Sequence, residues 1–167
     1  MYKRQGYANL CKIVSKGFVE GFYYKPRVDY EVLEKYHEGI ICLSACLAGE
    51  VQKYLARGEY EKGKEAALKY EKIFGKGNYF LEMQDHGIPE QATVNQQLMR
   101  MSEELEIDLV CTNDVHYTFA DDVEAHDILL CIQTGKKKRS QQRDGGGRYG
   151  ALSWLCGVSY SVYGLNW

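Results

Sequence analysis

The chain has 167 residues, of which 45% are hydrophobic, 26% are charged and only 2 are proline. This composition excludes a disordered, collagen-like or low-complexity protein and predicts a globular domain with a core of its own. No apolar run approaches the roughly 18 residues of a membrane helix, and the first residues lack the order of a signal peptide, so we expect a cytoplasmic protein. The 6 cysteines are expected to be thiols rather than disulfides.

The net charge of −2 conceals an uneven distribution. Residues 136–167 carry six basic side chains and one acidic side chain, a net of +5, so the rest of the chain sums to −7. An acidic body is poorly suited to duplex DNA, whereas acidic groups around a cleft would suit cations. Residues 1–5 and 145–167 show no periodic pattern. We therefore expect a non-native leader at 1–5, a domain at 6–136, and an irregular tail at 137–167 that is consistent with a reading-frame error.

Between these ends, helices and strands are predicted to alternate. Hydrophobic periodicity, caps and glycine stops predict a helix over 7–16, a helix from an N-cap at Asp29 to Gly39, a strand over 40–43, and helices over 49–57 and 59–74. A strand then runs from 79 and closes at 82–84, followed by a long helix from Pro89 and a strand over 107–111. The last predicted helix begins with a capping pair, Asp121 and Glu124, and ends at Gly135.

The strands read as short continuous apolar runs separated by helices. Such runs are typical of parallel strands buried on both faces, which need crossover connections, so the fold class is α/β. Working residues of these folds gather on the loops after the carboxyl ends of the strands. Here those loops are residues 44–46, 84–87 and 112–117.

The third loop carries Asp114 and His116, an Asp-x-His pair that can present a carboxylate oxygen and an imidazole nitrogen to one cation. The alternative is an ordinary turn with an Asx hydrogen bond. Cys46 could supply a third ligand or could be a small buried residue. We expect these three side chains to approach one another.

The remaining candidates are assigned to supporting roles. Asp85 and His86 are expected to orient a loop or a neighbouring ligand rather than to bind a metal. His126 lies among apolar helix positions and is interpreted as a packed histidine. His37, at a helix end, is interpreted as a solvated cation.

Blocks of sequence carry a family resemblance. Residues 17–27 (GFVEGFYYKPR), 43–50 (LSACLAGE), 82–87 (EMQDHG), 112–117 (TNDVHY) and 125–136 (AHDILLCIQTGK) resemble, in order and spacing, the later part of the N-terminal polymerase and histidinol phosphatase (PHP) domain of bacterial DNA polymerase III α subunits. The match runs from Gly6 to Lys136.

The resemblance implies an incomplete PHP-type distorted (β/α) barrel with a cluster of divalent metal ions (zinc, manganese or magnesium) at its strand ends. It assigns Cys46, Asp114 and His116 to metal-ligand positions, with Asp85, His86 and Asn113 as candidates for supporting them; no catalytic residue is assigned. In the family this domain is associated with metal-dependent 3′–5′ exonuclease activity or with a structural role, on a DNA-directed DNA polymerase that works with DNA, a proofreading exonuclease and a sliding clamp.

The chain also departs from the family pattern. The opening His-x-His motif and the polymerase aspartates are absent, so we expect a fragment of the subunit that lacks the polymerase site and is inactive alone. Two alternatives stay open. One is a stand-alone PHP phosphoesterase similar to histidinol phosphatase, and the other is a metal-free platform that binds a proofreading subunit.

Overall fold

The structure, a computed structural model, describes residues 3–135 and confirms the α/β class. Its elements are α1 (Lys3–Val19), α2 (Tyr30–Tyr36), β1 (Cys42–Leu43), α3 (Glu50–Ala56), α4 (Tyr60–Phe74), β2 (Tyr79–Met83), α5 (Pro89–Leu105), β3 (Leu109–Cys111), the 3₁₀ turn η1 (Ala120–Asp122) and α6 (Val123–Thr134).

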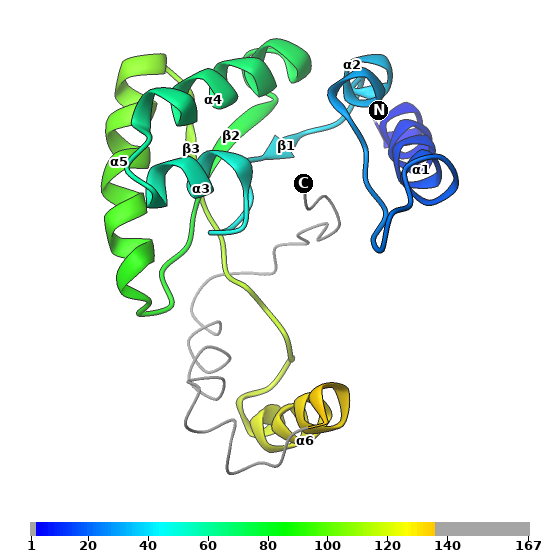
Figure 1. The fold of residues 1–167 in the computed structure, drawn as a ribbon, viewed down its shortest axis with the longest axis vertical. Helices are drawn as coiled ribbons and strands as arrows, with labels where there is room; N and C mark the ends of the chain where they lie inside the picture. Colours follow the sequence, from blue (N-terminus) through cyan, green and yellow to red (C-terminus); the bar gives the residue numbers. More distant parts are fainter. Residues whose placement is uncertain (1–2, 136–167) are drawn as a thin grey trace.

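The three strands form one parallel sheet in the order β1-β2-β3. Cys42 pairs with Tyr79, and Leu81 pairs with Leu109. Helices α3 and α4 connect β1 to β2, and α5 connects β2 to β3, as parallel pairing requires. These three helices gather around β2 in the upper left of Figure 1.

The expectation of strands buried on both faces holds only for β2. Tyr79 and Leu81 in this strand are fully enclosed. The runs predicted at 40–43 and 107–111 shorten to two and three paired residues. Ile41, next to β1, is 65% exposed, and Leu109 and Cys111 in β3 are also exposed. The prediction was wrong there because a strand is buried on both faces only where other elements cover both faces. Leu109 and Cys111 lie two residues apart and so point to the same face of β3, which is left exposed.

The core lies between β2 and the helices that surround it. Leu98 and Met101 of α5, Leu55 of α3 and Ala67 of α4 are each at most 1% exposed. Burial of such side chains contributes roughly 1.5–3 kcal/mol each. This packing fixes the carboxyl ends of the strands, from which the loops of the candidate site emerge.

Helices α1 and α2 form a pair joined to β1 by residues 37–41 (Figure 1). The predicted N-cap is confirmed, because the backbone N–H of Val32 donates to Oδ1 of Asp29 at 2.9 Å. Helix α1 is longer than the predicted 7–16 and begins at Lys3, so it takes in residues 3–5 of the expected leader. His37 follows α2, with Nδ1 2.7 Å from the carbonyl oxygen of Glu34.

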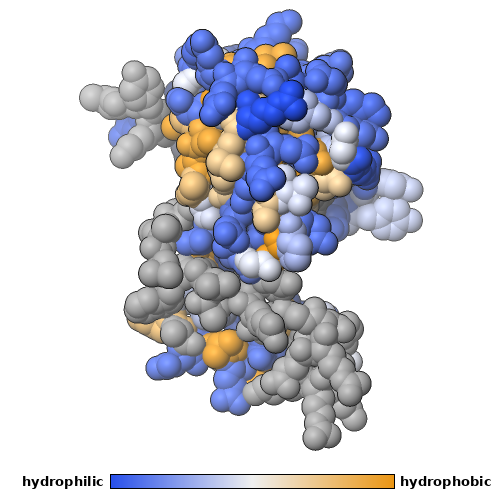
Figure 2. Space-filling model, turned by 90° about the vertical axis from the view of Figure 1, so that its left-hand side faces the viewer, coloured by the Kyte–Doolittle hydropathy of each residue, from blue (hydrophilic) through white to orange (hydrophobic). Residues whose placement is uncertain are grey.

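Helix α6 ends at Gly135, whose left-handed φ of 66° confirms the predicted stop. The predicted capping pair is wrong: the N-cap residue is Asp122, which makes no side-chain cap and instead accepts a hydrogen bond from the N–H of Phe119 at 3.0 Å. No residue of α6 is buried. The lower part of the space-filling view, where α6 lies, shows hydrophobic surface (Figure 2).

Within residues 3–135, no helix is both long and apolar enough to cross a membrane. None of the five cysteines in this part of the chain forms a disulfide, as expected. The predicted irregular tail, with Trp154 and Trp167, lies outside the described residues.

Candidate functional site

A cleft of about 310 Å³ lies where the three strand-end loops approach α6. Its lining includes Cys46 from the loop after β1, Gln84 and His86 from the loop after β2, Asp114 and His116 from the loop after β3, and His126 from α6. The structure therefore brings the three predicted metal ligands to one cleft.

The first loop is held by a buried glutamine. Gln52 Nε2 donates to Ser44 Oγ at 2.6 Å and to the carbonyl oxygen of Ala45 at 2.9 Å, and the N–H of Glu82 donates to the same Ser44 Oγ at 2.8 Å. Ala45 itself has a left-handed φ of 69°. The loop that presents Cys46 is thus tied to both α3 and β2.

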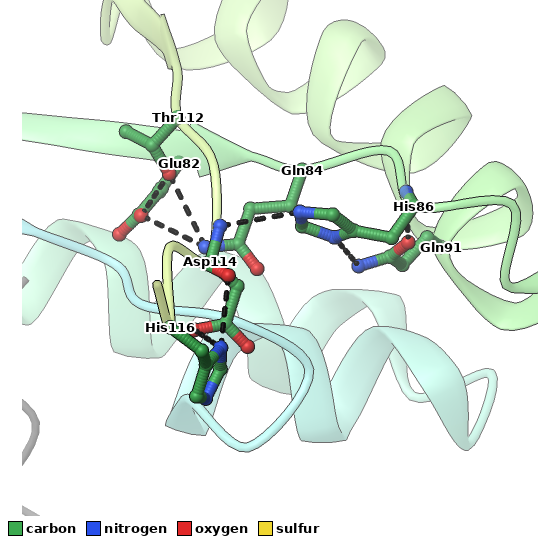
Figure 3. A network of polar contacts seen from close by, with 7 residues as sticks. All are labelled: Glu82, Gln84, His86, Gln91, Thr112, Asp114 and His116. Carbon is green, nitrogen blue, oxygen red and sulfur yellow. Dashed lines mark hydrogen bonds and ion pairs between the residues drawn. The ribbon is translucent and has the colours of Figure 1, made fainter. Parts of the chain in front are cut away.

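A buried carboxylate lies beneath the second and third loops. Glu82 is 4% exposed, and the hydroxyl of Thr112 donates to its Oε1. Gln84 Nε2 donates to the same oxygen at 3.3 Å and to Thr112 Oγ1 at 3.2 Å (Figure 3). A buried charge is stable only when it is hydrogen-bonded, and Thr112 and Gln84 supply these hydrogen bonds to Glu82. The hydrogen bond from Thr112 also joins the end of β2 to the start of the Asp114 loop.

Sequence analysis did not identify the Glu82–Thr112–Gln84 group. One signal was available: an acidic residue within an apolar run that belongs to a buried strand needs polar partners. The run did not single out Gln84, and it could not indicate Thr112, which lies after the next strand.

His86 fixes the Asp114 loop from the other side. Its backbone N–H donates to Gln91 Oε1 at 2.8 Å, its Nδ1 lies 3.1 Å from Gln91 Nε2, and the N–H of Asp114 points at its Nε2 at 3.2 Å (Figure 3). A neutral imidazole has one acceptor nitrogen, so the ring cannot accept from Gln91 and from Asp114 at the same time. His86 is 4% exposed, and its ring lies against the backbone N–H of Asp114, a position from which it can orient this loop.

Asp114 and His116 sit at the open side of the cleft. The Nδ1 atom of His116 lies 3.0 Å from the carbonyl oxygen of Asp114 and 3.7 Å from its Oδ1. Both side chains are partly exposed to solvent. Asp85, by contrast, is exposed and accepts a hydrogen bond from the N–H of Gly87, and Asn113 is half-buried.

His126 is a cleft residue that the sequence assigned to packing. Its ring centroid lies 5.6 Å from that of His116 and 5.3 Å from that of Tyr117. Burial, with the charge of Asp127 as a smaller cause, raises the pKa of the Tyr117 hydroxyl. The apolar neighbours of His126 in the sequence suggested a core, but α6 buries none of them.

The chemistry of the lining fits a divalent cation, since thiolate, carboxylate and imidazole are all zinc ligands. The positions fit less well. Among residues 3–135, no three His, Cys, Asp or Glu side chains are placed to hold one ion. Cys46, Asp114 and His116 therefore share a cleft without converging on a point inside it.

Comparison with known proteins places the chain in a family. Residues 1–86 match the model of the PHP domain, and the chain belongs to the PHP domain family.

Its relatives point to one kind of protein within that family. The chain is 48% identical to DNA polymerase III subunit alpha of Deinococcus radiodurans over 130 residues, which cover 78% of this chain and 10% of that protein. It is 49% identical to DNA polymerase III subunit alpha of Treponema pallidum over 138 residues, covering 83% of this chain and 12% of that protein. The chain thus spans about a tenth of the length of these relatives.

Proposed function

We propose that the chain is the PHP segment of a bacterial DNA polymerase III α subunit, which carries out DNA-templated DNA synthesis in chromosomal replication. The identity of 48–49% over most of the chain supports this proposal. The polymerase reaction, the cytoplasmic location, and the partnership with DNA, a proofreading exonuclease and a sliding clamp belong to the whole subunit. The three parallel strands with their crossover helices would form part of a PHP-type (β/α) barrel.

We further propose that the cleft contributes Cys46, Asp114 and His116 to the binding of a divalent cation. The observation that carries this proposal is that two loops distant in sequence, one after β1 and one after β3, bring these side chains to one cleft. Held by these residues, such a cation would supply Lewis-acid chemistry for 3′–5′ phosphodiester hydrolysis. The chain's own contribution is to fix the ligands: Gln52 holds the Cys46 loop, and Thr112 and His86 hold the Asp114 loop.

Isothermal titration calorimetry of the 167-residue chain with Zn²⁺ or Mn²⁺ tests the proposal. Asp114→Asn and His116→Ala should each weaken binding by at least about 10- to 100-fold, because each changes a ligand, and even the loss of a group that supports a ligand costs that much. His37→Ala is the matched control, since this histidine lies at the end of α2. Equal binding by all variants would reject the metal role and favour the metal-free platform.

A further inference from the structure

The N-terminal part of the chain differs in charge from the rest of the described protein. Residues 1–28 hold six basic side chains and one acidic side chain, a net of +5, whereas residues 29–135 hold nine basic and 21 acidic side chains, a net of −12. The single acidic group, Glu20, is paired with Lys16 at 2.7 Å. The end of α1 and the loop after it, residues 16–28, hold three basic side chains and this one acidic side chain, a net of +2.

Four aromatic rings are exposed in this basic segment. Phe18, in the last turn of α1, stacks on Phe22 with ring centroids 6.5 Å apart, and the rings of Tyr23 and Tyr24 meet edge to face at 4.6 Å. Tyr24 is 83% exposed, and the other three are more than half exposed. We call these four rings, together with the adjacent Lys25 and Arg27, the aromatic platform.

The backbone of the platform is held in place rather than loosely attached. The N–H of Arg27 donates to the carbonyl oxygen of Gly21 at 3.2 Å, and the N–H of Tyr23 donates to that of Lys25 at 3.1 Å. A Cβ on Gly21 would lie 1.9 Å from the carbonyl oxygen of Arg27, so only glycine allows this approach. Tyr24 adopts a left-handed φ of 59°, a strained conformation for a large residue. The rings are thus presented to solvent by a fixed loop (Figure 1, below α1).

The combination of rings and cations indicates the kind of partner. Exposed rings alone would suit an apolar protein surface, but here Lys25 and Arg27 follow the rings directly, and the Arg27 guanidinium lies 5.5 Å from the centroid of Tyr23. Aromatic rings that stack on bases, beside cations that contact phosphates, are the features of single-strand binding surfaces. We propose that the aromatic platform binds single-stranded DNA. The choice of DNA over RNA rests on the proposed function, whereas the surface itself is independent of the metal cleft.

Fluorescence anisotropy of a labelled oligothymidylate, titrated with the 167-residue chain in the presence of EDTA, tests this inference. Tyr24→Ala should weaken binding about 10-fold, because loss of one stacked ring costs roughly that much. Tyr7→Ala is the matched control, since Tyr7 is a 69% exposed tyrosine of α1 outside the platform. It should leave the affinity unchanged.

The salt dependence separates stacking from charge. Lys25→Gln and Arg27→Gln should each lower the slope of log K against log salt by about 0.7, the value for one phosphate contact to a single strand. Lys76→Gln, at an exposed site of the body, should not change the slope. Duplex DNA should bind more weakly than the single strand, because its bases are already stacked.

Three outcomes would overturn the inference. They are no binding of the oligonucleotide, equal affinity of Tyr24→Ala and Tyr7→Ala, or a loss of affinity with Lys137→Gln and Lys138→Gln that the platform variants do not show. The last result would assign the binding to the basic residues after Gly135. Because EDTA removes divalent metal, a failed metal titration in the cleft leaves this result intact, and the two proposals can fail separately.

Discussion

The α1–α2 pair and α6 lie at opposite ends of the described chain, and each is joined to the central body by a segment without regular structure (Figure 1). The first is docked: Ile13 of α1, Leu33 of α2 and Val28 of the loop between them belong to the hydrophobic core. The second is not: no residue of α6 is buried, and Ile132 is 74% exposed. Both segments carry apolar residues at helical spacing, so the comparison shows that periodicity predicts a helix without telling whether it has a partner.

The contacts that fasten the first pair are specific. The hydroxyl of Tyr30, at the start of α2, donates to Glu50 Oε2 at 2.6 Å, and that of Tyr70 in α4 donates to the same oxygen at 2.9 Å. Helix α6 approaches the rest through the rings of His116, Tyr117 and His126. The cleft is therefore bounded on one side by a helix of which no residue is buried.

The largest effect is expected from matched leucine truncations in the two regions. Leu33→Ala should lower the free energy of unfolding by about 2–5 kcal/mol, because Leu33 is 4% exposed and its removal leaves a cavity. Leu129→Ala in α6 should change it by less than about 0.5 kcal/mol, because this side chain is half exposed. Urea unfolding followed by circular dichroism measures both. Equal losses would show that α6 is packed as firmly as α2.

A smaller effect is expected where the segment leading to α6 leaves the sheet. Thr112→Val removes the hydroxyl that donates to the buried Glu82 carboxylate and should cost about 1–3 kcal/mol. Thr134→Val is the control at the far end of α6, where the exposed hydroxyl donates only to the carbonyl oxygen of Leu130 at 2.7 Å. The same urea experiment measures this pair, and a Thr112 variant as stable as the parent would argue against the network of Figure 3.

Local sequence signals predicted the helices well because caps, glycine stops and apolar spacing act within one element. The N-cap at Asp29 and the stop at Gly135 are examples. The exposure of Ile41 beside β1 and of Leu109 in β3 was not predicted, since the burial of a strand depends on which elements pack over its faces.

The candidate site shows the same division. Parallel strand order brought Cys46, Asp114 and His116 to one cleft, as the loop positions predicted. The place of His126 depends on how the irregular segment before α6 turns, and the pairing of Glu82 with Thr112 depends on strand register. Neither property is encoded in local spacing, which is why both were missed.

The smallest effect concerns pH and the contact that docks α2. Burial, and then the hydrogen bond to Glu50, raises the pKa of Tyr30 to about 12 from its ordinary value of 10.0, and burial raises the pKa of Tyr70 as well. Above pH 10 the unfolded chain loses these protons before the folded chain does, so the folded state holds more protons and its stability falls as the pH rises. The contribution is complete below about pH 10 and decreases toward pH 12 for Tyr30.

Urea unfolding at about pH 9 and about pH 11 measures this decrease, and Tyr30→Phe should make it smaller, because phenylalanine has no proton to lose. Tyr24→Phe is the control, since Tyr24 is exposed and the hydrogen bond to Glu50 is made by Tyr30 instead. If both variants lost as much stability between the two pH values as the parent does, the hydrogen bond between Tyr30 and Glu50 would not be the cause of the pH dependence. If Tyr30→Phe alone reduced this loss, the docking of α2 would depend on the protonated hydroxyl of Tyr30.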